Sequence, residues 1–96
     1  MLVLKPCCEN CGIDLPYNST EAMICTFECT FCKDCAQIVF KNVCPNCGGG
    51  FAPRPIQPKK YLEKYPVSSK RIHNPKDLDE HKKLLAQFQT IPPENR

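Results

Sequence analysis

The spacing of the cysteines constrains this chain more than any other feature. Nine of its 96 residues are cysteines, and all nine lie before residue 52. Eight of them form four close pairs, with two or three residues between the members of each pair. The pairs are Cys8 and Cys11, Cys25 and Cys29, Cys32 and Cys35, and Cys44 and Cys47. Eight thiolates are enough for two tetrahedral sites of four ligands, which is the coordination typical of structural Zn²⁺.

Metal ions explain these cysteines better than disulfides do. A cysteine-rich head of about fifty residues cannot bury a large core, so it needs disulfides or metal to stay folded. The start, MLVLKPCCEN, lacks the apolar run and cleavage site of a signal peptide, and no stretch has the roughly 18–20 apolar residues that span a bilayer. We therefore expect a cytoplasmic protein with no membrane partner, in a reducing compartment that favours metal-bound cysteines.

Local patterns indicate how the pairs are presented. Gly12 follows the first pair directly and Gly48 follows the last. This is the pattern of a zinc knuckle, a turn whose N–H groups point at the first sulfur and whose glycine accepts a positive φ angle. The pair Cys32/Cys35 precedes the apolar run AQIVF, so we expect it at the start of a short helix over about residues 33–42. Upstream, AMICTFECTF predicts a short hairpin.

A knuckle, a hairpin and a ligand pair at a helix start together describe a treble-clef zinc site. This arrangement pairs the first knuckle with the helix start and leaves the other four cysteines for a second site. Site 1 would comprise Cys8, Cys11, Cys32 and Cys35, and site 2 Cys25, Cys29, Cys44 and Cys47. The two sites would then interleave along the chain as a cross-brace.

Other ligand groupings stay open at this point. A zinc ribbon would join the two glycine-followed knuckles in one site, leaving the four central cysteines as a local site or as free thiols. A bacterial iron–sulfur cluster would place its three-residue gap last, whereas here that gap comes first. A redox C-x-x-C enzyme would need a βαβ context, which the sequence does not indicate.

The ligand order resembles that of RING-type domains, with CTFC at their ligand-x-Phe-Cys step and CPNC at their Cys-Pro-x-Cys ending. The chain is more closely similar to small bacterial cysteine-rich proteins grouped as domain of unknown function 1272. The strings that carry this resemblance are DLP, AMIC, FECTFC, CPNCGG and a following RP, and it covers residues 1–58. It implies a RING-like zinc-binding fold and brings no established activity. Cys7 lies outside the pattern and is expected to be a spare thiol, with replacement of Cys8 as the alternative.

The same residues bear on function. RING-type ubiquitin ligases commonly have an aliphatic residue where this chain has Asn10, often carry Arg or Lys where it has Gly48, and often have a tryptophan, which this chain lacks. A ligase-like adaptor is therefore the least favoured reading. Two closed sites of four thiolates leave no position for water, so we expect structural zinc and no enzyme. The only histidines, His73 and His81, are expected to be solvated. The expected apolar core comprises Ile24, Phe27, Phe31, Ile38, Val39 and Phe40.

Charge divides the chain. Residues 1–50 carry a net −2, which becomes about −6 when eight thiolates bind two Zn²⁺, and residues 51–96 carry a net +5. The basic segment predicts either a solvated linker that folds partly onto the acidic head or a surface for an anionic partner such as nucleic acid. The candidate contacts are Arg54, Lys59, Lys60, Lys64, Lys70 and Arg71.

A helix is predicted near the C-terminus. Asn74 would cap it and Pro75 would take its first position. Its apolar stripe would comprise Leu78, Leu85, Phe88 and Ile91, with Leu84 beside them. This stripe would pack either on the head or on another chain. The predicted organisation is a small metal-stapled α+β RING-like head at 1–52, a basic linker at 53–74, an amphipathic helix at 75–91 and a tail at 92–96. We expect a protein-binding or scaffold module, with a nucleic-acid-binding regulatory zinc protein as the alternative.

Overall fold

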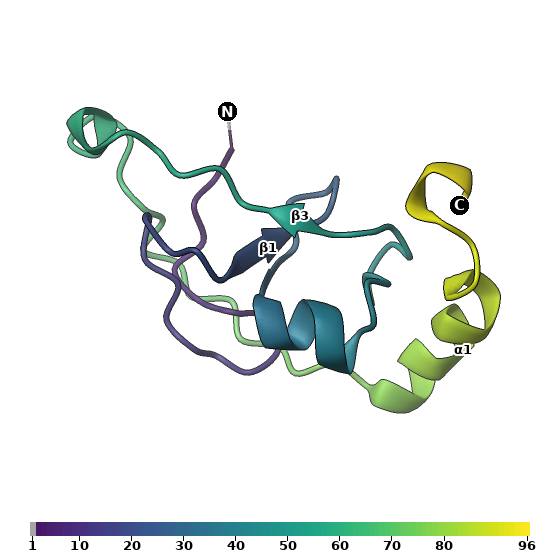
Figure 1. Ribbon diagram of the computed structural model, residues 1–96. Helices are drawn as coiled ribbons and strands as arrows, with labels where there is room; N and C mark the ends of the chain where they lie inside the picture. The colour runs from purple at the N-terminus through teal and green to yellow at the C-terminus, as the bar shows by residue number, and fades with distance from the viewer. Residues whose placement is uncertain (1) are drawn as a thin grey trace.

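The computed structural model describes residues 2–96 and shows a small α+β protein of about 43 × 26 × 18 Å (Figure 1). Three short antiparallel strands form one sheet in the order β2-β1-β3. A short helix, η1, follows the sheet hairpin, and the longer helix α1 lies near the C-terminus. The elements are β1 (Ala22–Ile24), β2 (Thr30–Cys32), η1 (Cys35–Val39), β3 (Ala52–Pro53), η2 (Lys59–Tyr61), α1 (Leu78–Phe88) and η3 (Pro93–Asn95).

The hairpin predicted from AMICTFECTF is confirmed. Strands β1 and β2 pair antiparallel, with Ala22 opposite Cys32 and Ile24 opposite Thr30. β-Branched and aromatic side chains favour this extended pairing. The sequence did not predict β3, which pairs with the other edge of β1 and places Pro53 opposite Met23. A proline is tolerated there because an edge strand has a side on which no N–H is needed.

The helix predicted over about residues 33–42 forms but ends earlier. Its central turn is a π-helical segment, in which the Phe40 N–H donates to the Cys35 carbonyl at 2.8 Å. Lys41 and Asn42 then take positive φ angles of 50° and 61°, which a right-handed helix does not allow. The helix still begins at the pair Cys32/Cys35, as predicted.

One small core lies between the sheet and η1. Phe31 and Phe40 are fully buried and meet edge to face with ring centroids 5.0 Å apart, while Phe51 meets Phe31 at 5.5 Å. The prediction that Phe27 and Ile38 belong to this core is wrong, because they are 75% and 70% exposed. Phe27 lies in the turn between β1 and β2, and Ile38 lies on the outer side of η1.

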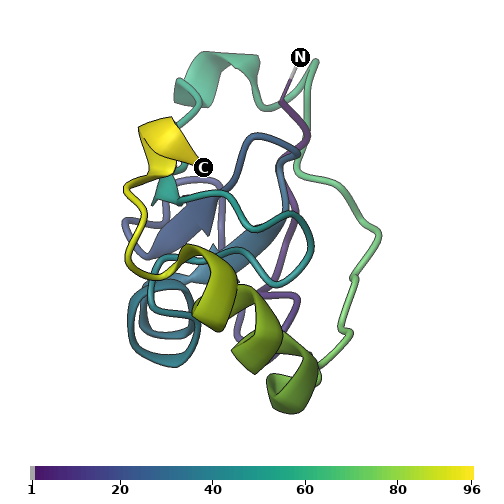
Figure 2. The same ribbon diagram turned by 90° about the vertical axis from the view of Figure 1, so that its right-hand side faces the viewer.

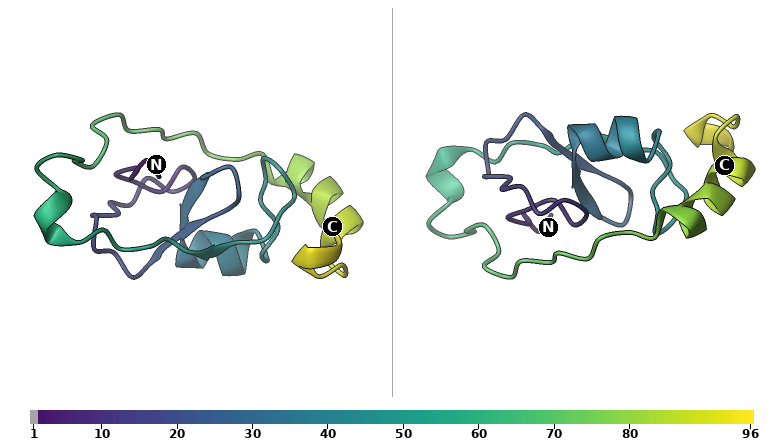
Figure 3. Two further views of the ribbon diagram at one scale, coloured as in Figure 1. Left: turned by 90° about the horizontal axis from the view of Figure 1, so that it is seen from above. Right: turned by 90° about the horizontal axis from the view of Figure 1, so that it is seen from below.

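The basic segment after β3 returns along the N-terminal part of the chain. The Ser68 N–H donates to the Leu4 carbonyl at 2.9 Å, and the Asn74 N–H donates to the Glu9 carbonyl at 2.7 Å. Figure 3 shows this segment running from η2, at one end of the molecule, towards α1 at the other. The segment is therefore held against the head at several points.

Helix α1 begins three residues later than predicted. Its N-cap is Asp77, whose carboxylate accepts hydrogen bonds from the N–H groups of Asp79 and Glu80 at 2.9 and 3.3 Å. The prediction of Asn74 as the cap is wrong, because its N–H bonds to the head and holds the chain extended there. An aspartate cap also suits the positive end of the helix dipole.

Helix α1 packs on its own head, one of the two arrangements that the sequence left open (Figure 2). His81 is only 2% exposed, and its Nε2 lies 2.8 Å from the Val43 carbonyl. Its ring meets the Phe40 ring at 5.0 Å. The prediction that His81 is solvated is therefore wrong. Leu78, which the apolar stripe was expected to bury, is 50% exposed.

Candidate metal centres

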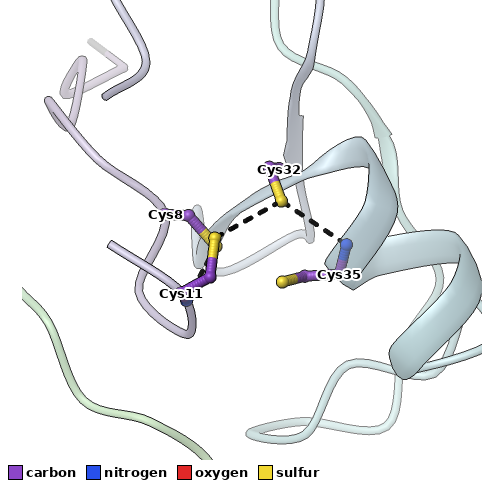
Figure 4. A group of neighbouring side chains, drawn as sticks. All are labelled: Cys8, Cys11, Cys32 and Cys35. Atoms are coloured by element: carbon purple, nitrogen blue, oxygen red, sulfur yellow. Dashed lines mark hydrogen bonds between the residues drawn. The ribbon is translucent and has the colours of Figure 1, made fainter. Parts of the chain in front are cut away.

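Four cysteine side chains converge between the first knuckle and the start of η1 (Figure 4). They are Cys8, Cys11, Cys32 and Cys35, and their sulfur atoms all lie within 4.8 Å of one another. The first two come from the N-terminal loop, the third ends β2 and the fourth begins η1. The structure therefore brings together the four residues predicted for site 1.

The sulfur spacing in this group suits a tetrahedral ion. Zinc–thiolate bonds of about 2.3 Å in a tetrahedron place the sulfurs about 3.8 Å apart. The Cys11 and Cys32 sulfurs, which come from different pairs, lie 3.7 Å apart. The donor set is all sulfur, which suits soft or borderline metals such as zinc. These residues could hold a metal ion without a change of fold.

The first knuckle has the predicted geometry. The Gly12 N–H donates to the Cys8 carbonyl at 3.0 Å, and the Cys11 N–H lies 3.5 Å from the Cys8 sulfur. Gly12 has a φ of +80°, which glycine adopts without strain. Across the site, the Cys35 N–H lies 3.5 Å from the Cys32 sulfur. Backbone donors therefore point at the first sulfur of both pairs.

The second group contains three cysteines, Cys25, Cys44 and Cys47, again with all sulfurs within 4.8 Å of one another. The knuckle is built like the first, because the Gly48 N–H donates to the Cys44 carbonyl at 2.8 Å and Gly48 has a φ of +79°. Cys29, predicted as the fourth ligand, is not in this group. It lies across the hairpin turn, where its carbonyl accepts the Cys25 N–H at 3.3 Å.

Burial governs the titration of several of these thiols. It raises the pKa of Cys35 and of Cys44 far above the ordinary value for a thiol. Burial also raises the pKa of Cys8, but the backbone N–H groups of Cys11 and its neighbours outweigh this and lower it overall. Because only thiolates bind metal, an incoming cation must displace these protons.

An asparagine side chain in each knuckle affects a cysteine thiol outside that knuckle. Both knuckles read C-x-N-C-G, with Asn10 in the first and Asn46 in the second. The Asn10 Nδ2 donates to the Cys35 sulfur at 3.4 Å. Burial raises the pKa of Cys29, and a hydrogen bond from the Asn46 side chain lowers it in part. The sequence did not lead us to expect that either asparagine acts on a cysteine, although the repeated five-residue string was a signal that could have found them.

Two other sequence-based alternatives can be compared with the structure. A zinc ribbon would need the two knuckles in one site, but they lie in separate groups. A local site made of the four central cysteines does not form either, because Cys32 and Cys25 belong to different groups. Cys7 lies outside both groups, is 1% exposed, and points its sulfur at the Ile72 carbonyl 3.6 Å away.

The basic candidates fall into different environments. Arg54 is only 3% exposed, and its guanidinium donates to the carbonyls of Lys5, Leu15 and Pro16 at 2.8, 3.2 and 2.9 Å. It does not lie at the surface as expected, and burial lowers its pKa. Arg71 is exposed but bonds to Asp14 at 2.7 Å. The exposed remainder comprises Lys59, Lys60, Lys64 and Lys70.

The fold and the cysteine groups define a small cysteine-rich α+β protein with two groups that could hold metal ions. The chain belongs to a bacterial family described as a protein of unknown function (DUF1272), which matches residues 1–57. It is 53% identical over 75 residues to an uncharacterised protein of Rhizobium meliloti (strain 1021), covering 78% of this chain and 89% of that relative. The family inferred from the sequence is thereby confirmed. No solved structure matches the chain significantly. Within residues 2–96, no helix is both long and apolar enough to cross a membrane.

Proposed function

We propose that this protein is a cytoplasmic, RING-like module of the treble-clef type, folded around two structural Zn²⁺ ions and acting as a protein-binding or scaffold module. The observation that carries the proposal is the convergence of four sulfurs at near-tetrahedral spacing, contributed by two pairs far apart in the chain. Each pair of one group is followed by a pair of the other. Two ions bound in this order would brace the head crosswise.

Cys29 completes the second site in this proposal. The two knuckles have the same sequence pattern, and the asparagine of the first contacts the second cysteine of its facing pair, Cys35. In the second knuckle, hydrogen bonding by the Asn46 side chain lowers in part the pKa of Cys29, the second cysteine of the remaining pair. Cys29 is half-buried beside Cys25, so adjustment of the hairpin turn brings it to the ion. Site 2 then comprises Cys25, Cys29, Cys44 and Cys47.

Such sites are structural. A catalytic zinc keeps one coordination position open for water, whereas four thiolates fill every position and reduce the Lewis acidity of the ion. We therefore infer no catalysis at either site. Structural zinc contributes about 10–16 kcal/mol to the folding of zinc-finger peptides, which is large for a head with so few buried aromatic residues.

Elemental analysis of the purified full chain tests the metal sites. We expect two zinc ions per chain in the wild type and one in Cys29→Ser. The matched control is Cys7→Ser, which alters a buried cysteine outside both groups and should retain two. Iron in place of zinc, or two zinc ions in Cys29→Ser, would contradict the assignment. Removal of zinc by a strong chelator should abolish the circular dichroism of the fold, and an unchanged spectrum would count against a structural role.

A second function has support from the basic segment. Lys59, Lys60 and Lys64 are exposed beside Tyr61 and Tyr65, a combination that also suits single-stranded nucleic acid. Binding to an oligonucleotide that weakens steeply with added salt would favour this alternative. Stoichiometric binding to one protein partner, insensitive to nuclease, would favour the scaffold role.

A further inference from the structure

An apolar groove lies between the N-terminal segment and the loop that follows β3. It has a volume of about 360 Å³, within the range of about 300–1,000 Å³ that is usual for ligand pockets. Its main lining residues are Leu2, Leu4, Ile56, Pro58, Tyr61 and Tyr65. Tyr61 of η2 lines the groove, which therefore lies at the end of the molecule opposite α1 (Figure 3). It is separate from both cysteine groups.

The groove leaves large apolar side chains in contact with water. Ile56 is 51% exposed, Tyr61 is 45% exposed and Tyr65 is 40% exposed. Single exposed apolar residues are common on protein surfaces and need no explanation. Three that line one hollow, next to the more buried Leu4, form the kind of contiguous patch that marks an interaction site.

The segment that supplies most of the groove is rich in lysine. Residues 55–70 contain four lysines and a single acidic residue, Glu63. Among residues 2–96, none of these four lysines forms an ion pair, whereas Lys76 and the lysines of α1 do. Lys64 lines an adjoining hollow that shares Leu4 and Tyr65 with the groove. An occupant with carboxylates beside an apolar group would therefore find complementary charge.

The lysines also bear on the choice between peptide and nucleic acid. The Lys60 ammonium lies over the Tyr61 ring, 5.1 Å from its centroid, and the Lys64 ammonium lies over the Tyr65 ring at 5.5 Å. A nucleobase that stacks on either ring from that side would have to displace the ammonium group. An apolar side chain can enter the groove and leave both ammonium groups in place to meet flanking carboxylates.

We propose that this groove docks an acidic segment of a partner protein, with one bulky apolar side chain seated between Tyr61, Tyr65 and Ile56 and flanking Asp or Glu side chains against the lysines. The inference rests on the proposed protein-binding role and names its surface and the chemistry of its partner. Binding would join an apolar anchor to a charged rim, which is the usual anatomy of a peptide site.

Selection from a displayed library of random short peptides against the zinc-loaded full chain tests the proposal. We expect enrichment of peptides in which a bulky apolar residue is flanked by Asp or Glu. A synthetic, fluorescently labelled peptide with the most enriched sequence then serves as the probe for affinity measurements. Failure to enrich any peptide, or enrichment of sequences without acidic residues, would overturn the proposal.

Paired variants locate the binding surface. Ile56→Glu places a charge in the groove and should weaken peptide binding at least about tenfold, which corresponds to about 1.4 kcal/mol. The matched control is Ile38→Glu, the same change at a 70% exposed position on η1, and it should bind as the wild type does. Equal affinity for the two variants would place the peptide elsewhere.

A second pair of variants distinguishes the lysines beside the groove from the overall positive charge of the chain. Lys60→Gln with Lys64→Gln should reduce affinity several-fold at low salt, and Lys82→Gln with Lys83→Gln, which removes equal charge from α1, should not. An equal loss of peptide affinity in the two double variants would indicate diffuse electrostatic attraction and refute docking in the groove. Displacement of the peptide by a single-stranded oligonucleotide whose binding Ile56→Glu abolishes would assign the groove to nucleic acid instead. A wild-type protein that binds two zinc ions but no peptide would refute only the proposed peptide docking. A wild-type protein that binds no zinc would refute the proposed metal sites.

Discussion

Replacement of Gly48 by alanine tests how the C-terminal helix is held on the head. Gly48 follows the last cysteine and has a φ of +79°, a conformation that alanine adopts only with strain. A Cβ at this position would lie 2.7 Å from Cε2 of Phe88 and 2.9 Å from its Cδ2, closer than such contacts occur. The substitution therefore strains the knuckle and also forces the Phe88 ring, at the end of α1, to move.

Gly12 provides a matched control, because it occupies the same place in the other knuckle. Its φ is +80°, and a Cβ there would lie 3.3 Å from the nearest atoms of the His73 ring. That separation needs a shift of only a few tenths of an ångström by a side chain at the surface. Gly12→Ala therefore carries the backbone cost of Gly48→Ala and little of its packing cost.

The two costs have separate magnitudes. A left-handed conformation costs an L-residue about 1–2 kcal/mol, and the stiffer unfolded chain of alanine offsets about 0.4–1 kcal/mol of this. Displacement of a packed ring costs about 1–3 kcal/mol. We therefore expect Gly12→Ala to lower the free energy of unfolding by about 1 kcal/mol and Gly48→Ala to lower it by about 2–4 kcal/mol.

Denaturant unfolding of the zinc-loaded protein measures both values, with free zinc held constant because bound metal adds to apparent stability. A double-mutant cycle with Phe88→Ala isolates the free energy of the clash between the new Cβ and the Phe88 ring. Without the ring, Gly48→Ala should cost only about as much as Gly12→Ala, which gives a coupling of about 1–3 kcal/mol. Equal losses for the two single variants, or a Gly48→Ala cost that does not change when Phe88 is absent, would refute the packing of α1 on this knuckle.

Three further predictions concern the head. Arg54→Lys keeps the positive charge, but an ammonium group cannot reach all three carbonyls that the guanidinium binds. Denaturant unfolding should therefore show a free energy of unfolding lower by about 2–4 kcal/mol. A decrease near zero would contradict the role of the guanidinium. Asn10→Ala and Asn46→Ala each remove a hydrogen-bond donor to a cysteine sulfur. Each should lower zinc affinity by about 10–100-fold, measured by competition with a chromogenic chelator. Unchanged affinity would contradict this role. Because burial raises the pKa of Cys35 and Cys44, these thiols hold their protons in the metal-free chain at neutral pH. Zinc affinity should therefore fall as pH falls, with proton release measurable by calorimetry in buffers of different ionisation enthalpy, and binding without proton release would contradict this.

The parts of the fold that sequence predicts well are local. The knuckles follow from ligand spacing and a glycine, and the positive φ angles of Gly12 and Gly48 agree with that reading. The hairpin and the start of η1 follow from residue types within a few positions of one another. The treble-clef pattern also predicted the grouping of Cys8 and Cys11 with Cys32 and Cys35, although the sequence left a zinc ribbon open.

The parts that sequence does not predict depend on long-range contacts. Asn74 and Asp77 are both good helix caps, and the choice between them is made by a hydrogen bond from the Asn74 backbone to Glu9, far away in the chain. His81 is buried because the head offers it the Val43 carbonyl, which no local pattern reveals. Phe27 is exposed because the head has one thin core, and the turn that holds this residue lies at its margin.

The C-terminal segment, residues 76–96, is attached to both knuckles, and this links its position to the cysteine groups. Glu9 lies inside the first knuckle with its carboxylate buried, where it accepts the Thr30 N–H at 2.7 Å and faces the Lys76 ammonium at 3.9 Å, just before α1 begins. Beyond the other end of α1, the guanidinium of Arg96 donates to the Gly48 carbonyl at 3.1 Å, in the second knuckle. The segment from Lys76 to Arg96, which contains α1, thus extends from one knuckle to the other. Because the backbone of each knuckle is shaped around its cysteines, the same turns that present the sulfurs also fix where the C-terminal segment lies.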